Sequence, residues 1–153
     1  MRITLICVGR LNREYLPLWR HYEGLLRPYA ELQVLEVPER PLKQGLQQAR
    51  TKEGAALQGL LRERADLVVL DAKGRELSSE ELSAYLAQRK SAGQSHFQFV
   101  IGGPAGLPAE LLTEADLVWS LSRLTLPHQL VRCLVVEQLY RACRIERGEP
   151  YHY

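Results

Sequence analysis

The sequence has few cysteines, and their placement excludes two common kinds of stabilising site. Its 153 residues include three cysteines, Cys7, Cys133 and Cys143. None belongs to a C-x-x-C pair or has a histidine at the spacing of a metal ligand, so neither a disulfide framework nor a zinc site is expected. Cys7 and Cys133 lie in apolar stretches, and we expect all three cysteines to be buried free thiols in a reducing compartment.

Long apolar runs are also lacking. No stretch approaches the roughly 20 apolar residues that span a membrane, and the apolar run at residues 3–8 is too short for the core of a secretory signal. We therefore expect a cytoplasmic protein without a membrane partner. The hydrophobic fraction of 46% and the charged fraction of 25% are close to globular averages and exclude a disordered or low-complexity chain. A single domain over residues 1–153 is predicted.

Lysine is scarce, and the overall charge is small. Only Lys43, Lys52, Lys73 and Lys90 are lysines among the 20 basic residues, and 18 acidic residues leave a net charge of +2. This balance neither indicates nor excludes a nucleic-acid partner. Arginine suits bidentate contacts to phosphate and stacking on bases, but a biased genomic composition is the simpler explanation for the preference for arginine.

Five short apolar segments rich in β-branched residues are spaced along the chain. They lie at residues 3–8, 32–37, 66–70, 97–101 and 116–120. Nearly unbroken apolar runs of this length are typical of parallel strands buried on both faces. Segments with helical spacing lie between them, at residues 12–27, 44–64 and about 78–93, with a short one after Pro108. The alternation predicts an α/β fold with a mostly parallel sheet and helices on both faces.

The last predicted helix, at residues 128–145, has too many apolar residues for an ordinary surface helix. Its apolar positions cover more than one face, whereas a surface helix needs one apolar stripe about 100° wide. The excess fits either a deep position in the core or a homodimer interface, and the pattern alone favours neither.

Three loops are the candidate ligand site, because ligands of open parallel sheets bind at the carboxyl ends of the strands. They lie at residues 70–74, 101–106 and 121–128. The second loop has three glycines within five residues, which either bring the backbone close to a ligand or form a tight turn. No P-loop or G-x-G-x-x-G motif is present. The third loop alternates apolar residues with Ser and Thr, a pattern suited to an aromatic ligand.

Candidate acids and bases are few. Of the four histidines, His128 opens the last helix beside the third loop and His152 lies near the C-terminus. No Ser-His-Asp order and no H-E-x-x-H motif accompanies them. Residue chemistry alone therefore predicts a ligand-binding α/β domain and leaves its reaction open.

Several segments together resemble a known enzyme family. The Gly102-Gly103-Pro104 and Leu124-Thr125-Leu126-Pro127-His128 stretches are specific in combination. The sequence resembles the RlmH family, SPOUT-class methyltransferases that act on N3 of a pseudouridine in large-subunit rRNA. The resemblance runs from residue 1 to residue 153 without a large insertion. The segments that carry it are residues 67–74, 99–107, 119–132, 137–142 and 150–152.

The resemblance implies a C-terminal trefoil knot and an obligate homodimer. It thereby favours the interface explanation for the last helix, so that a polar substitution at Val135 or Leu139 is expected to weaken the dimer. The family binds S-adenosyl-L-methionine in a bent form in the knot, and its reaction needs no metal. The cofactor positions carried over by resemblance are Leu70, Gly102, Leu121, Ser122, Arg123, Leu124, Thr125 and Leu126.

The resemblance also implies roles for several polar residues. In the family the C-terminal tail of one subunit reaches the cofactor site of the other, so Tyr151 and His152 are the candidates for closing the site and handling the proton of N3–H. His128 is a further catalytic candidate. Arg10 and Arg132 are candidates for contacting RNA phosphates, and Arg132 alternatively orients the knot loop.

The activity that the resemblance implies is methylation of a pseudouridine in helix 69 of 23S rRNA, on assembled ribosomes. Two alternatives stay open, a catalytically silent SPOUT-fold protein that binds RNA or ribosomes and a SPOUT methyltransferase for another RNA base. The chain departs from the family at Tyr153, where relatives commonly carry Arg or Lys.

Overall fold

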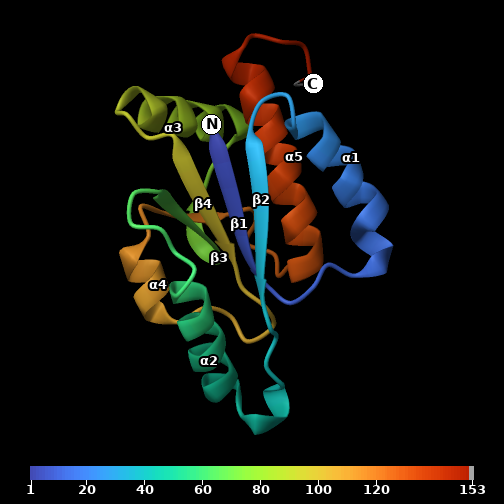
Figure 1. Cartoon of the computed structure of the whole chain (residues 1–153), viewed down its shortest axis with the longest axis vertical. Helices are drawn as coiled ribbons and strands as arrows, with labels where there is room; N and C mark the ends of the chain where they lie inside the picture. The colour runs from blue at the N-terminus through green and yellow to red at the C-terminus, as the bar shows by residue number, and fades with distance from the viewer. Residues whose placement is uncertain (152–153) are drawn as a thin grey trace.

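A parallel five-stranded sheet lies at the centre of the computed structural model, which describes residues 1–151 (Figure 1). The strand order in this described part of the chain is β2-β1-β4-β3-β5, and every neighbouring pair is parallel. The predicted α/β fold with a mostly parallel sheet is confirmed. The strands are β1 (Arg2–Val8), β2 (Glu31–Val37), β3 (Asp66–Glu76), β4 (His96–Ile101) and β5 (Leu117–Ser120).

Helices cover both faces of the sheet, as predicted (Figure 1). One hydrophobic cluster joins the sheet to Trp19 of α1, Leu86 of α3 and Leu139 of α5. The other joins it to Leu57 of α2 and Leu111 of α4. The helices are α1 (Leu16–Leu26), α2 (Leu46–Gln58), α3 (Ser79–Ser91), α4 (Ala109–Glu114) and α5 (His128–Glu146), with short 3-10 turns at Arg13–Tyr15 and Leu42–Gln44.

Two helices are shorter than their apolar patterns predict. The segment from residue 12 first forms a 3-10 turn, and α1 begins at Leu16, with Pro17 in its first turn, a position where the missing N–H of proline costs no helical hydrogen bond. The second helix ends at Gln58 instead of residue 64. The chain then returns to the sheet, where the Gln98 side chain bonds both the N–H and the carbonyl of Arg62 at 3.0 and 2.9 Å.

Strand β3 is longer than predicted and contains the whole of the expected first loop at residues 70–74. The polar residues after Leu70 read as a loop, yet β3 continues to Glu76 and pairs with β5 on both sides of an irregularity between Leu70 and Arg75. Gly74 makes this possible, because a Cβ at this position would lie 2.6 Å from the Val118 carbonyl oxygen. The extension therefore packs tightly against β5 at Val118.

The apolar excess of α5 is accounted for largely by the core of the chain itself. Val135 and Leu139 are almost fully buried, at 0% and 1% exposure. Helices α1 and α3 both pack against α5, and Ser83 of α3 donates a hydrogen bond to the Ala142 carbonyl at 2.9 Å. The core explanation is therefore right for these positions, and the expectation that Val135 and Leu139 form a dimer interface is wrong.

The cysteines are buried free thiols, as predicted. Burial raises the pKa of Cys7 to about 12 and that of Cys143 to about 11, so both thiols stay protonated at neutral pH. Within residues 1–151, no helix has the length and apolarity needed to cross a membrane. The same residues contain no cluster of His, Cys, Asp and Glu able to hold a metal ion.

Candidate functional site

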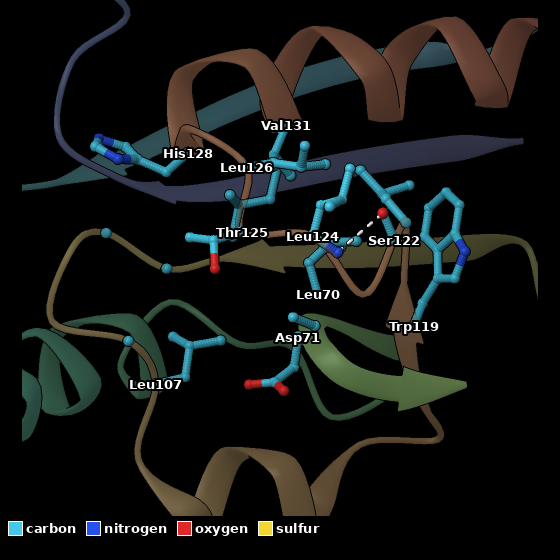
Figure 2. Close-up of a pocket in the computed structure, with 16 residues that line it drawn as sticks. Leu70, Asp71, Leu107, Trp119, Ser122, Leu124, Thr125, Leu126, His128 and Val131 are labelled. Atoms are coloured by element: carbon cyan, nitrogen blue, oxygen red, sulfur yellow. Dashed lines mark hydrogen bonds between the residues drawn. The ribbon is translucent and has the colours of Figure 1, made fainter. Parts of the chain in front are cut away.

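The three predicted loops meet at one cavity of about 280 Å³ at the carboxyl edge of the sheet (Figure 2). Thr125 and Leu126 lie on one side of it, and Asp71 and Leu107 lie on the other. Its walls come from β3 and its extension, from the glycine-rich loop after β4, and from the segment between β5 and α5. The lining residues are Leu70, Asp71, Ala72, Ile101, Gly102, Gly103, Gly106, Leu107, Trp119, Leu121, Ser122, Leu124, Thr125, Leu126, His128 and Val131.

The segment after β5 is held in place by two serine side chains. Ser120 is buried, and its hydroxyl lies 3.0 Å from the carbonyl oxygens of Ala72 and Ser122. The Ser122 hydroxyl accepts a hydrogen bond from the Leu124 N–H at 3.0 Å (Figure 2). These bonds tie the third loop to the β3 extension, so two walls of the cavity are fixed relative to each other.

The glycine-rich loop is a tight turn that also exposes backbone to the cavity. Gly106 has a φ of +79°, which favours glycine, and a Cβ on Gly102 would lie 2.9 Å from Leu107 Cγ. Arg50 of α2 donates a hydrogen bond from Nε to the Ala105 carbonyl at 2.9 Å. The two explanations offered by the sequence are therefore compatible, because the turn itself brings the backbone to the cavity wall.

Seven of the eight predicted cofactor positions line the cavity, and Arg123 does not. The Arg123 side chain is 91% exposed and lies 3.7 Å from the Glu76 carboxylate. Leu124 lines the cavity while remaining 71% exposed. Sequence reasoning did not single out Asp71, Leu107, Trp119 or Val131 as site residues, although all four lie within the segments that carry the family resemblance.

His128 stands at the start of α5 and at the rim of this cavity. Its Nε2 lies 3.6 Å from Glu39 Oε1, and its side chain is partly exposed. Figure 2 shows its ring turned away from Thr125 and Leu126. The residue that sequence reasoning named as a secondary catalytic candidate is thus close to the cavity, with a carboxylate beside it.

Comparison with known proteins agrees with this arrangement. A family model described as "Predicted SPOUT methyltransferase" matches residues 1–152. The chain belongs to the SPOUT methyltransferase family. A relative of this SPOUT methyltransferase, the ribosomal RNA large subunit methyltransferase H of Moorella thermoacetica, is 42% identical over 99% of this chain and 99% of its own length. The resemblance recognised in the sequence is confirmed.

A solved structure supports the fold alone. A probable methylase family protein from Haemophilus influenzae matches 99% of this chain and 70% of its own length, with a TM-score of 0.53 and 15% sequence identity. At that identity the likeness concerns the arrangement of the elements and carries no information about side-chain roles.

Arg132 of this SPOUT methyltransferase lies inside the protein. It is 2% exposed, and its guanidinium donates hydrogen bonds to Glu36 Oε2 at 2.6 Å and to the Gly9 carbonyl at 2.7 Å. Such contacts hold α5 against the ends of β1 and β2 and leave no free face for a phosphate. These contacts support a positioning role for Arg132. The segment that it holds in place is the turn at Gly9, and not the loop after β5. Arg10, in contrast, is exposed at the position directly after Gly9.

Tyr151 follows α5 and folds back against Glu137 and Arg141 of that helix, away from the residues that line the cavity of its own chain. Its hydroxyl donates a hydrogen bond to Glu137 Oε1 at 3.1 Å, and the Arg141 guanidinium lies 4.6 Å from the centre of its ring. Burial first, and then the charge of Glu137, raise the pKa of Tyr151 to about 12. In this position the hydroxyl is protonated at neutral pH and acts as a donor. His152, the other predicted tail residue, lies outside the described residues.

Proposed function

We propose that this SPOUT methyltransferase transfers the methyl group of S-adenosyl-L-methionine to N3 of a pseudouridine in helix 69 of 23S rRNA, on assembled ribosomes in the cytoplasm. The observation that most directly supports this proposal is the cavity at the carboxyl edge of the sheet, where the glycine-rich loop and the loop after β5 meet. The name of the Moorella thermoacetica relative supports large-subunit rRNA as the substrate. We assign residues 1–153 to one catalytic domain.

The residues around the cavity fit a sulfonium cofactor of this kind. Its volume of about 280 Å³ is near the lower end for small-molecule sites, which are about 300–1,000 Å³. Leucine side chains offer apolar walls for an adenine ring, and the glycine-rich loop offers backbone groups for its polar edge. Asp71 is the one carboxylate among the lining residues, and its negative charge complements the positive charge of the cofactor.

The bound cofactor supplies an electrophilic methyl group, so the protein's own task is positioning and proton handling. Holding two reacting atoms in line contributes as much as about 7–11 kcal/mol. The ring N3–H must lose its proton, and a well-placed base contributes about 10²–10⁴-fold. We keep His152, His128 and Tyr151 as the candidates, with Tyr151 as a closing residue, since its pKa of about 12 keeps the hydroxyl protonated at neutral pH.

A homodimer is part of this proposal, because Tyr151 does not approach its own cavity. Tyr151 contacts Glu137 and Arg141, whereas the cavity uses His128 and Val131 of α5. At 1.5 Å per residue, the two regions are separated by roughly 9–20 Å along the helix axis. In a homodimer, the tail of one protomer completes the cavity of its partner.

A trefoil knot is also part of the proposal. The chain leaves α4 on one face of the sheet, forms β5, and reaches α5 on the other face. Between β5 and α5 it passes the β3 extension, to which Ser120 is bonded, and lines a cavity with the glycine-rich loop. This route supports a threaded crossing at residues 121–127.

The weak net charge of +2 fits an enzyme that recognises a ribosomal surface better than one that wraps free RNA, because phosphate contacts dominate binding to free RNA. Arg10 is the exposed candidate for a phosphate contact.

Two measurements on the purified chain test the proposal. Calorimetry should detect binding of S-adenosyl-L-methionine in the low-to-mid micromolar range, and ribosomes lacking the modification should acquire one methyl group on the helix 69 pseudouridine. Absence of cofactor binding would favour a silent binding protein. Methylation of a different base would identify a SPOUT methyltransferase of other specificity.

A further inference from the structure

A second cavity, of about 810 Å³, adjoins the first at His128. It lies where β1, β2 and α5 meet, and its walls include Asn12, Glu39 and Gln129. His128 lines both cavities, and its ring turns away from the first one (Figure 2). A molecule in the second cavity would therefore lie next to whatever occupies the first.

The Glu39 carboxylate stands at the wall between the two cavities. Its Oε1 lies 3.6 Å from His128 Nε2. A Cβ added to Gly9 would lie 3.5 Å from the same oxygen, and one added to Gly103, which lines the first cavity, would lie 3.9 Å from it. These distances place the carboxylate beside the backbone of both glycines, and its side chain is still 48% exposed. It is placed to contact a ligand.

The wall of the second cavity beside Glu39 is braced. Gln129 is buried, and its side-chain oxygen accepts a hydrogen bond from the Asn12 N–H at 2.7 Å. Its side-chain nitrogen donates to the Arg10 carbonyl, also at 2.7 Å. Arg132 holds the neighbouring Gly9 carbonyl. The turn after β1 is therefore fixed to the start of α5, which preorganises this cavity for a ligand.

The acidic side chains of this cavity favour a base beside Glu39, whereas Arg10, which also lines the cavity, is suited to a backbone phosphate. Glu36 and Glu39 both line it, and the charge of Glu36 is paired with Arg132. A carboxylate repels phosphate oxygens, but it accepts hydrogen bonds from ring and exocyclic N–H groups. Enzymes that modify a base commonly extrude it into a pocket and read its Watson–Crick edge. The acceptor base of the proposed reaction presents an N–H on that edge, at N3.

We propose that the second cavity holds the acceptor base and that Glu39 accepts a hydrogen bond from its ring N3–H. This inference rests on the proposed function and adds to it the place of the substrate base and the residue that recognises its reactive edge. Glu39 then favours an unmethylated uracil-type ring, because a methyl group on N3 removes the donor of this hydrogen bond.

Binding to ribosomal subunits tests the recognition without turnover. Fluorescently labelled protein, without cofactor, is titrated with large subunits from a strain that lacks the methyltransferase and from its parent strain. We expect the wild type to bind the unmethylated subunits at least about fivefold more tightly, and Glu39→Ala to bind both kinds equally. The control is Glu110→Ala, which removes a carboxylate from a cavity between α2 and α4 and should keep the wild-type preference.

Kinetics give a second readout. Glu39→Ala should lower kcat/KM for ribosomes by about 10- to 100-fold, as expected for loss of a hydrogen bond to a charged group, while Glu39→Gln, which keeps an acceptor oxygen, should recover part of it. The dissociation constant for S-adenosyl-L-methionine should stay within about twofold of the wild type, which a general loss of folding would not allow.

Two results would overturn the inference. In the first, Glu39→Ala keeps the preference for unmethylated subunits. In the second, the wild-type protein binds both kinds of subunit equally, although their rRNA differs in this methyl group. Mass spectrometry of the two samples separates this failure from failure of the proposed function. Identical rRNA in both strains would defeat the proposed function itself.

Discussion

Arg132 illustrates how one residue can serve the site without touching a ligand. It is the largest fully buried side chain in the described part of the chain, and it joins α5 to Glu36 on β2 and to the turn at Gly9. Removing one partner of a buried ion pair leaves the other without compensation. The residue thereby links the helix that opens with His128 to the walls of the second cavity.

Arg132→Met should lower the free energy of unfolding by about 3 kcal/mol, at the low end for a buried ion pair because Glu36 is partly exposed. Urea unfolding followed by tryptophan fluorescence, at one fixed protein concentration, measures the change. Arg10→Met, at an exposed position, is the control and should change stability by less than about 0.5 kcal/mol. A loss below about 1 kcal/mol for Arg132→Met would contradict the structural role.

His152→Ala should reduce methylation by about 10²–10⁴-fold if His152 handles the proton of N3–H, with cofactor affinity nearly unchanged. Single-turnover methylation of ribosomes gives the rate, and calorimetry gives the affinity. If cofactor binding collapses together with activity, the tail is a structural lid and the assignment of proton handling to His152 is wrong.

At the scale of elements, the β3 extension shapes the site. The extension carries Asp71 and Ala72 to the cavity and packs closely against Val118 of β5 at Gly74. Because the obstacle to a side chain at Gly74 is the backbone carbonyl of Val118, a shift of one side chain cannot relieve it. The geometry of this contact therefore depends on glycine.

Gly74→Ala should destabilise the protein by about 1–3 kcal/mol, the usual range for overpacking, and weaken binding of S-adenosyl-L-methionine. Thermal unfolding and calorimetry measure the two effects. The matched control is Gly24→Ala in α1, where an added Cβ meets nothing within 4 Å and should stabilise by about 0.5–1 kcal/mol. Wild-type stability and cofactor affinity in Gly74→Ala would argue against a tight contact.

The positions of the strands could be predicted well from the sequence. The full length of β3 and the packing of α5 could not. Strands buried on both faces are nearly continuous apolar runs, so their pattern is local. The β3 extension is polar and is held by a long-range contact, at Gly74 and Val118, that no local pattern contains. The covering of α5 by α1 and α3 depends on topology, which the apolar positions of α5 do not reveal.

At the scale of the whole molecule, the cavity could be predicted because parallel strands place their following loops at one edge. Seven of the eight cofactor positions that the resemblance implies line this cavity. The burial of Arg132, the place of Tyr151 and the contact between Glu39 and His128 could not be predicted, since each joins residues about 90 apart or depends on how the tail folds back. Periodicity gives no sign of a knot, which is rare among folds.

Mixing two inactive variants tests the composite dimeric site. Thr125→Trp fills the cavity at an exposed position, and His152→Ala removes a tail residue. If the tail acts on the partner's cavity, equal mixing should restore about a quarter of wild-type activity, because half of the dimers are mixed and each has one complete site. No recovery after verified subunit exchange would show that each tail serves its own chain.

The most direct test of the central claim is mass spectrometry of rRNA from a strain in which the gene for this chain has been deleted. The account predicts that the helix 69 pseudouridine of 23S rRNA loses one methyl group. It also predicts that the wild-type gene restores this group and that the Thr125→Trp variant, with its cavity filled, does not. An unchanged methylated pseudouridine in the deletion strain would contradict the account.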